Sequence, residues 1–138
     1  MTGRDFLTVA RDLVLGSTEA HWRSAIGRAY YALLLECREA LSRWGLTYVA
    51  RDVHTSVRLR FFMLANPDLL TIARILEELN ELRGKADYRL QPYHAFSSNI
   101  RALKAIQDVS DRLDLLDAID ADPVRRANAI NIIRAKYP

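Results

Sequence analysis

The feature that most constrains the fold is the spacing of apolar residues between positions 19 and 45. Most polar side chains fall elsewhere, while apolar residues recur there at steps of four or three: Ile26, Tyr30, Leu33, Cys37, Leu41 and Trp44. Because an α-helix has about 3.6 residues per turn, this spacing places all of them on one face. The segment is therefore predicted to be a long amphipathic helix, started by Ser17-Thr18-Glu19 and ended by Gly45.

The rest of the chain repeats helical spacing, and no stretch alternates apolar and polar residues as a strand does. Five further helices are expected. The first ends at Gly16, and the second contains Val57, Phe61 and Leu64 and stops at Asn66-Pro67. The third is capped by Asp68 and runs to about Asp87; the fourth is opened by Ser97 or Ser98 and runs through Leu116; and the last runs from Val124 to about Lys136, after the cap and proline of Asp122-Pro123. The predicted fold class is an all-α, antiparallel up-and-down bundle of five to six helices.

The domain organisation follows from length and composition. A chain of 138 residues, half of them hydrophobic and 27% charged, is enough for one packed core without metals or disulfides. Residues 1–121 are expected to form the bundle. Residues 122–138 are expected to form a basic helix that packs on the bundle or extends from it.

Cysteine and hydropathy bear on location. The only cysteine is Cys37, so no intramolecular disulfide can form, and we expect it to act as a buried small hydrophobic residue. Charged residues interrupt the amino terminus, and the longest apolar run, residues 29–35, is too short for a bilayer. We expect a soluble cytoplasmic protein with no membrane contact.

The formal net charge of +3 permits phosphate contacts but does not by itself indicate nucleic acid. The histidines His21, His54 and His94 lie far apart in sequence, and no glycine-rich phosphate loop is present, so neither a metal site nor a cofactor is expected. Aspartates recur every third residue from Asp108 to Asp120. They should spiral around their helix as a solvated surface, with their charge set against the basic last helix.

Two segments stand out as sources of chemistry. The first, Arg23-Ser-Ala-Ile-Gly-Arg-Ala-Tyr-Tyr-Ala, combines alanines that let helices approach closely with tyrosine hydroxyls that need partners when buried. The second is Leu82-Arg-Gly-Lys-Ala-Asp-Tyr. Arg83 follows Leu79 by four residues, so it shares the apolar stripe and must find a carboxylate, a helix end or a phosphate. Asp87, one turn later, is the nearest candidate partner.

Together these blocks, with His54, Val57 and Phe61 between them, resemble the small stand-alone HEPN-domain proteins over roughly residues 5 to 118. The resemblance implies a helical bundle that commonly forms homodimers. Many relatives are ribonucleases, toxins paired with a nucleotidyltransferase-like antitoxin, or parts of antiviral defence. Its nuclease members carry an Arg followed after four to six residues by His, and they cleave RNA without metal in a cleft shared by two subunits.

Arg83 takes the arginine position of that motif, but the residue five positions later is Tyr88 instead of His. A tyrosine of ordinary pKa is a poor base near neutral pH, so Asp87 or His54 would have to compensate. The expected catalytic residues are therefore Arg83, Asp87, Tyr88 and His54. The Arg-x4-His count from Arg89 to His94 spans Pro92 and is read as accidental.

Arg28, Tyr31, Lys85 and Arg89 are the candidate contacts to RNA or nucleotide. Three functions remain open at this stage. In the first, the chain is a metal-independent endoribonuclease, active or degenerate. In the second, it is a non-catalytic dimer that binds nucleotide or docks a nucleotidyltransferase partner. In the third, it is a scaffold in which these residues only stabilise a dimer core.

Overall fold

The computed structural model describes residues 1–138 and contains only helices, so the predicted all-α class is confirmed. The α-helices are α1 (Gly3–Val14), α2 (Glu19–Arg43), α3 (Val53–Phe61), α4 (Pro67–Tyr88), α5 (Ile100–Ala121) and α6 (Pro123–Lys136). Two short 3-10 turns, η1 (Ala50–Asp52) and η2 (His94–Phe96), lie in the connections before α3 and α5.

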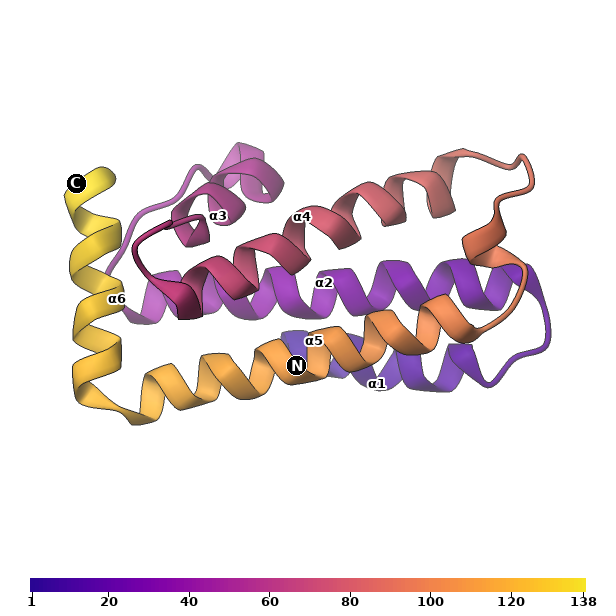
Figure 1. Ribbon diagram of the computed structural model, residues 1–138, viewed down its shortest axis with the longest axis horizontal. Coiled ribbons are helices and arrows are strands. Elements are labelled where there is room, and N and C mark those ends of the chain that lie inside the picture. Colours follow the sequence, from indigo (N-terminus) through magenta and orange to yellow (C-terminus); the bar gives the residue numbers. More distant parts are fainter.

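The long helix α2 is the centre of the bundle. It packs against α1, α3, α4 and α5, and the chain runs up and down along α1, α2, α4 and α5 (Figure 1). The short α3 lies beside α4, and α6 crosses one end of the bundle (Figure 1). None of the six helices combines the length and hydropathy needed to span a membrane.

The residue pattern of α2 explains its central place. Its apolar stripe is buried as expected, and alanines extend the buried surface to further sides, which lets neighbouring backbones approach: Ala25, Ala29, Ala32 and Ala40 are fully buried. Cys37 is fully buried as expected, and burial raises the pKa of its thiol, so the sulfur stays protonated and unreactive.

Gly45 ends α2 as the sequence predicts. Its φ of +70° lies in the left-handed region, which glycine adopts without steric cost. The Gly45 N–H donates to the carbonyl of Ser42 (3.1 Å) and the Leu46 N–H donates to that of Leu41 (2.9 Å). These two bonds form a Schellman motif, with buried Leu41 and Leu46 as its hydrophobic contact.

Three predicted helix boundaries are wrong. Helix α3 ends at Phe61, so Leu64 lies outside it and is 75% exposed. Helix α4 is capped by Asn66, whose side-chain oxygen accepts from the Leu69 N–H at 3.1 Å, because Pro67 occupies the first helical position in place of a cap at Asp68. The cap position of α5 is Asn99, and Ser98 only accepts from the N–H of Ile100.

The aspartates of α5 do not pair with the basic last helix as expected. Asp117 pairs with Arg4 of α1 (2.6 Å), and Asp120 pairs with Arg43 of α2 (2.5 Å). Asp108 contacts Lys104 on its own helix (2.8 Å). The spiral spreads these carboxylates over several neighbours, whereas α6 crosses only the end of the bundle.

Arg23 holds the connection between α4 and α5 in place. Its side chain is 10% exposed, and its terminal nitrogens donate to the carbonyls of Lys85, Ala86, Arg89 and Gln91 at 2.5–3.2 Å. Its Nε donates to Glu19 (2.8 Å), and the guanidinium carbon lies 4.4 Å from the ring centre of Phe96. Arg23 thus satisfies the end of α4, which has no glycine cap, and positions the loop beyond it.

Candidate functional site

The candidate site lies where α2, α3 and α4 meet. Helix α2 contributes Tyr30 and Tyr31, the start of α3 contributes His54, and the last turns of α4 contribute Arg83 and Asp87. The structure therefore brings together side chains from the three sequence blocks that suggested a function.

Tyr30 and His54 form the inner part of the site. The Tyr30 side chain is 1% exposed, and its hydroxyl lies 2.7 Å from Nδ1 of half-buried His54. The two rings are nearly parallel, with centres 5.7 Å apart. When the Nδ1–H donates to the Tyr30 oxygen, Nε2 keeps its lone pair and can accept a proton. The sequence predicted that the hydroxyl of a buried tyrosine would need a hydrogen-bond partner, but it did not identify His54 as that partner.

Arg83 lies over the two tyrosine rings. Its guanidinium carbon is 5.4 Å from the ring centre of Tyr30 and 5.6 Å from that of Tyr31, within cation–π range. The side chain is 13% exposed. The burial of the side chain is what the apolar stripe predicted, whereas the contact of its charged end with aromatic faces was not predicted.

Hydrogen bonds fix the orientation of the Arg83 guanidinium. Nη1 donates to Asp87 at 3.2 Å, which confirms the expected pair, and Nη2 donates to Asn80 at 3.1 Å. The buried Nε has no partner. A guanidinium has five N–H groups, so donors remain for an oxyanion.

Helix α2 approaches this pair at Gly27. A Cβ added there would lie 3.7 Å from an Asp87 oxygen and 3.8 Å from Cγ of Arg83, which is ordinary van der Waals contact. The glycine therefore sits directly against the Arg83–Asp87 pair, so the pair is in contact with α2 as well as with its own helix.

The electrostatics of the site favour a neutral imidazole. Burial and the positive charge of Arg83 lower the pKa of His54, and Asp52 opposes them. Burial raises the pKa of Tyr30 well above its usual value, although Arg83 and Arg58 act in the other direction. Near neutral pH the site therefore holds a neutral base beside a fixed cation, the pairing that general-base chemistry on a phosphodiester needs.

Tyr31 and Arg28 border the site. The Tyr31 ring meets His54 edge to face at 5.8 Å, and Arg28 is an exposed residue whose guanidinium carbon lies 5.9 Å from the Tyr31 ring centre. Of the four predicted binding residues, Tyr31 is therefore adjacent to the predicted catalytic residues His54 and Arg83, and Arg28 is adjacent to Tyr31.

The other three predicted residues lie apart from this cluster. Tyr88 is 77% exposed, at the last residue of α4. Lys85 donates to the hydroxyl of Tyr93 at 3.5 Å, and the Arg89 carbonyl accepts from Arg23. Lys85 follows Arg83 by two residues, which is about 200° around the helix, so the two side chains leave α4 on opposite sides.

The sequence did not predict a role for Asn80 or Arg58 beside this cluster, or for Arg23 at the end of α4. Asn80 precedes Arg83 by three residues, and side chains at this spacing are neighbours on a helix, so the sequence could have predicted their contact. Arg23 precedes Ile26 by three residues, so it too shares the buried stripe of α2. Arg58 had no such signal, because its charge acts on Tyr30 across the contact between α2 and α3.

No cluster of three or more histidine, cysteine, aspartate or glutamate side chains is arranged to hold a metal ion. In comparisons with known proteins, no family model matches the chain, and neither does any curated protein or solved structure.

Proposed function

We propose that the chain is a HEPN-type protein that acts on RNA, with Arg83 and His54 as the reacting pair of a metal-independent endoribonuclease. The observation that supports this proposal best is the guanidinium of Arg83, held over two tyrosine rings beside a histidine whose pKa its charge helps to lower. The proposal also rests on the sequence resemblance of the three blocks.

In this reaction Nε2 of His54 takes the proton of a ribose 2′-hydroxyl. The 2′-oxygen bonds to phosphorus, the bond from phosphorus to the 5′-oxygen breaks, and the departing oxygen takes a proton from water. Arg83 stabilises the negative charge that builds on the phosphate oxygens, and Asp87 orients Arg83. The products are a 2′,3′-cyclic phosphate and a 5′-hydroxyl. Two copies would pair so that their Arg83 side chains face a shared cleft, which Arg28 and Tyr31 would line.

The test uses the purified protein with an RNA oligonucleotide in the presence of EDTA. Arg83→Gln and His54→Gln should each slow cleavage about 100-fold or more. Arg38→Gln serves as the control, because Arg38 pairs only with Glu39 on the same helix (3.0 Å). An RNA with a 2′-deoxy residue at the cleaved position should resist. Absence of cleavage by the wild-type protein, or equal cleavage by Arg83→Gln, would contradict the nuclease.

A second function is favoured by Tyr88, which stands where the motif has histidine and is 77% exposed at the last residue of α4. In that case the chain is a non-catalytic dimer that binds RNA or nucleotide, or docks a nucleotidyltransferase-like antitoxin. Fluorescence anisotropy would then detect RNA or nucleotide binding without cleavage, weakened by Arg83→Gln. Co-purification with a nucleotidyltransferase encoded by a neighbouring gene would support the partner role, and failure to co-purify would count against it.

A further inference from the structure

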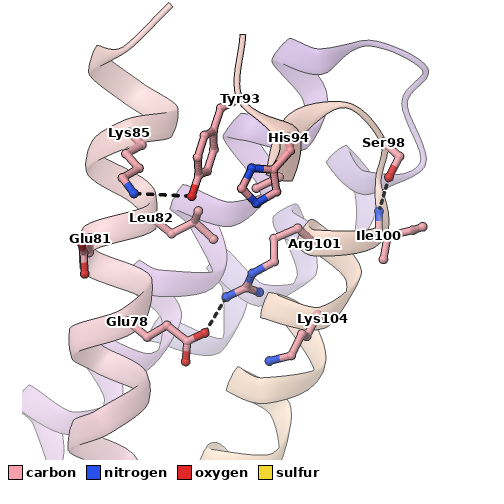
Figure 2. Close-up of a pocket in the computed structure, with 11 residues that line it drawn as sticks. Glu78, Glu81, Leu82, Lys85, Tyr93, His94, Ser98, Ile100, Arg101 and Lys104 are labelled. Atoms are coloured by element: carbon pink, nitrogen blue, oxygen red, sulfur yellow. Dashed lines mark hydrogen bonds and ion pairs between the residues drawn. The ribbon is translucent and has the colours of Figure 1, made fainter. Parts of the chain in front are cut away.

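A pocket of about 520 Å³ opens between α4 and α5. Its walls come from the last turns of α4, from the first turns of α5 and from the loop that joins them (Figure 2). The size falls within the roughly 300–1,000 Å³ typical of small-molecule sites. This pocket does not include Arg83 or His54, so its role is independent of the proposed nuclease.

Three cations line the pocket. Figure 2 shows Arg101 and Lys104 of α5 reaching toward α4, and Lys85 of α4 reaching toward Tyr93. Arg101 is 19% exposed, and its Nη2 donates to Glu78 at 3.0 Å. Its Nη1 is buried without a hydrogen-bond partner, and Arg101 is one of the residues that line the pocket, so its guanidinium keeps unused donor capacity beside the cavity.

The other donors also have hydrogen-bonding capacity to spare. Lys104 contacts Asp108 at 2.8 Å and keeps further N–H groups. Lys85 donates to the Tyr93 hydroxyl oxygen at 3.5 Å, which leaves the phenolic proton free to donate to a ligand. These groups match an anion with several oxygens around one centre, such as a phosphate.

Two carboxylates on the α4 wall restrict the ligand further. Glu78 is held by Arg101, whereas Glu81 is exposed at the rim, and both line the pocket. They oppose a ligand that is anionic along its whole length, such as a nucleic-acid backbone, by like-charge repulsion. They can accept hydrogen bonds from hydroxyl groups. The pocket therefore suits one phosphate attached to a body that carries hydroxyls.

The loop wall is fixed before any ligand binds. Arg23 donates hydrogen bonds to the carbonyls of Arg89 and Gln91, and its guanidinium lies over the ring of Phe96. The centres of the Phe96 and Tyr93 rings are 5.3 Å apart. A wall that is already ordered loses little conformational entropy on binding.

We propose that this pocket binds a phosphate monoester of a small sugar or polyol. Arg101, Lys104 and Lys85 bind the phosphate, and Glu78 and Glu81 accept from the hydroxyls of the body.

Isothermal titration calorimetry on the full chain tests the site with five probes: ribose 5-phosphate, glucose 6-phosphate, glycerol 3-phosphate, unphosphorylated ribose and inorganic phosphate. At least one phosphate ester should bind, and ribose should not. Lys104→Gln should weaken that binding about ten-fold, the loss of one charge-assisted contact of about 1.4 kcal/mol. Lys104 is 57% exposed, so this variant keeps the fold. Lys136→Gln, in α6 at the end of the bundle, is the charge-matched control and should bind as the wild type does.

Arg101→Gln adds a second variant, with circular dichroism as the check that it folds. Three results would overturn the proposal: no phosphate ester binding at millimolar concentration, equal binding by wild type and Lys104→Gln, or inorganic phosphate binding as tightly as every ester. The last would show an anion site that does not recognise the hydroxyl-bearing body. Because RNA cleavage is measured separately, failure of this site leaves the nuclease proposal unaffected, and the reverse also holds.

Discussion

Arg23 offers the most direct test of how the fold is held together. Arg23→Met keeps most of the aliphatic side chain but removes every hydrogen bond from the guanidinium to Glu19 and to the four carbonyls at the end of α4. The carbonyls of Lys85 and Ala86 are part-buried and buried, respectively, and both lose their charged donor, although that of Lys85 still accepts from the Arg89 N–H at 3.0 Å. Those of Arg89 and Gln91 belong to exposed residues and can bind water instead.

The size of the effect follows from these partners. A hydrogen bond from a charged group contributes about 1.5–3 kcal/mol, and two such losses amount to about 3–6 kcal/mol of unfolding free energy. For a chain of this length that lowers the melting temperature by about 10–20 °C. Most of the protein should still fold at room temperature, because domains of this size are stable by about 5–15 kcal/mol.

Urea denaturation followed by circular dichroism measures this loss, and amide hydrogen exchange should show residues 89–99 opening first. Arg28→Met on the same helix is the control. Arg28 is exposed and makes only cation–π contacts with Phe6 and Tyr31, so its loss should stay below about 1 kcal/mol. If Arg23→Met lost no more stability than Arg28→Met, the guanidinium would not be what orders the end of α4.

Two further predictions concern the site and the end of α2. The lowered pKa of His54 means that the unfolded chain binds more protons than the folded one below about pH 6.5, so unfolding free energy should fall as pH drops from there, by up to about 1.4 kcal/mol per unit. Denaturation curves between about pH 5 and 7 should show this slope in His94→Gln but not in His54→Gln, and an unchanged slope in His54→Gln would contradict the assignment. Gly45→Ala should cost about 1–2 kcal/mol because of its φ of +70°. Gly84→Ala in α4, where an added Cβ meets nothing within 4 Å, should instead gain up to about 1 kcal/mol, and equal effects of the two changes would refute the role of φ.

The position of Arg83 shows how far local spacing reaches. Its place on the apolar stripe of α4 indicated a buried stem and a need for a partner, and Asp87 one turn later is that partner. Both statements depend only on helical periodicity, which the sequence fixes over a few turns. The same spacing would have indicated Asn80, three residues earlier.

The contact between Tyr30 and His54 could not be derived in this way. The two residues are separated by 24 positions, and their distance depends on how α3 packs against α2. The partners of the α5 aspartates were mispredicted for the same reason, since Arg4 and Arg43 reach α5 from other helices. Ion pairs of this kind depend on crossing geometry, which a periodic pattern does not specify.

The sequence by itself determined the helices, the buried face of α2, the glycine that ends it and the Arg83–Asp87 pair, because each depends on residues within a turn or two of one another. Only the tertiary structure decided which helices lie side by side. It therefore also decided that His54 faces Tyr30, that Arg23 holds the end of α4, and that Lys85, Arg101 and Lys104 share a pocket. Those contacts join segments distant in sequence, and their energies depend on the burial and orientation that packing alone sets.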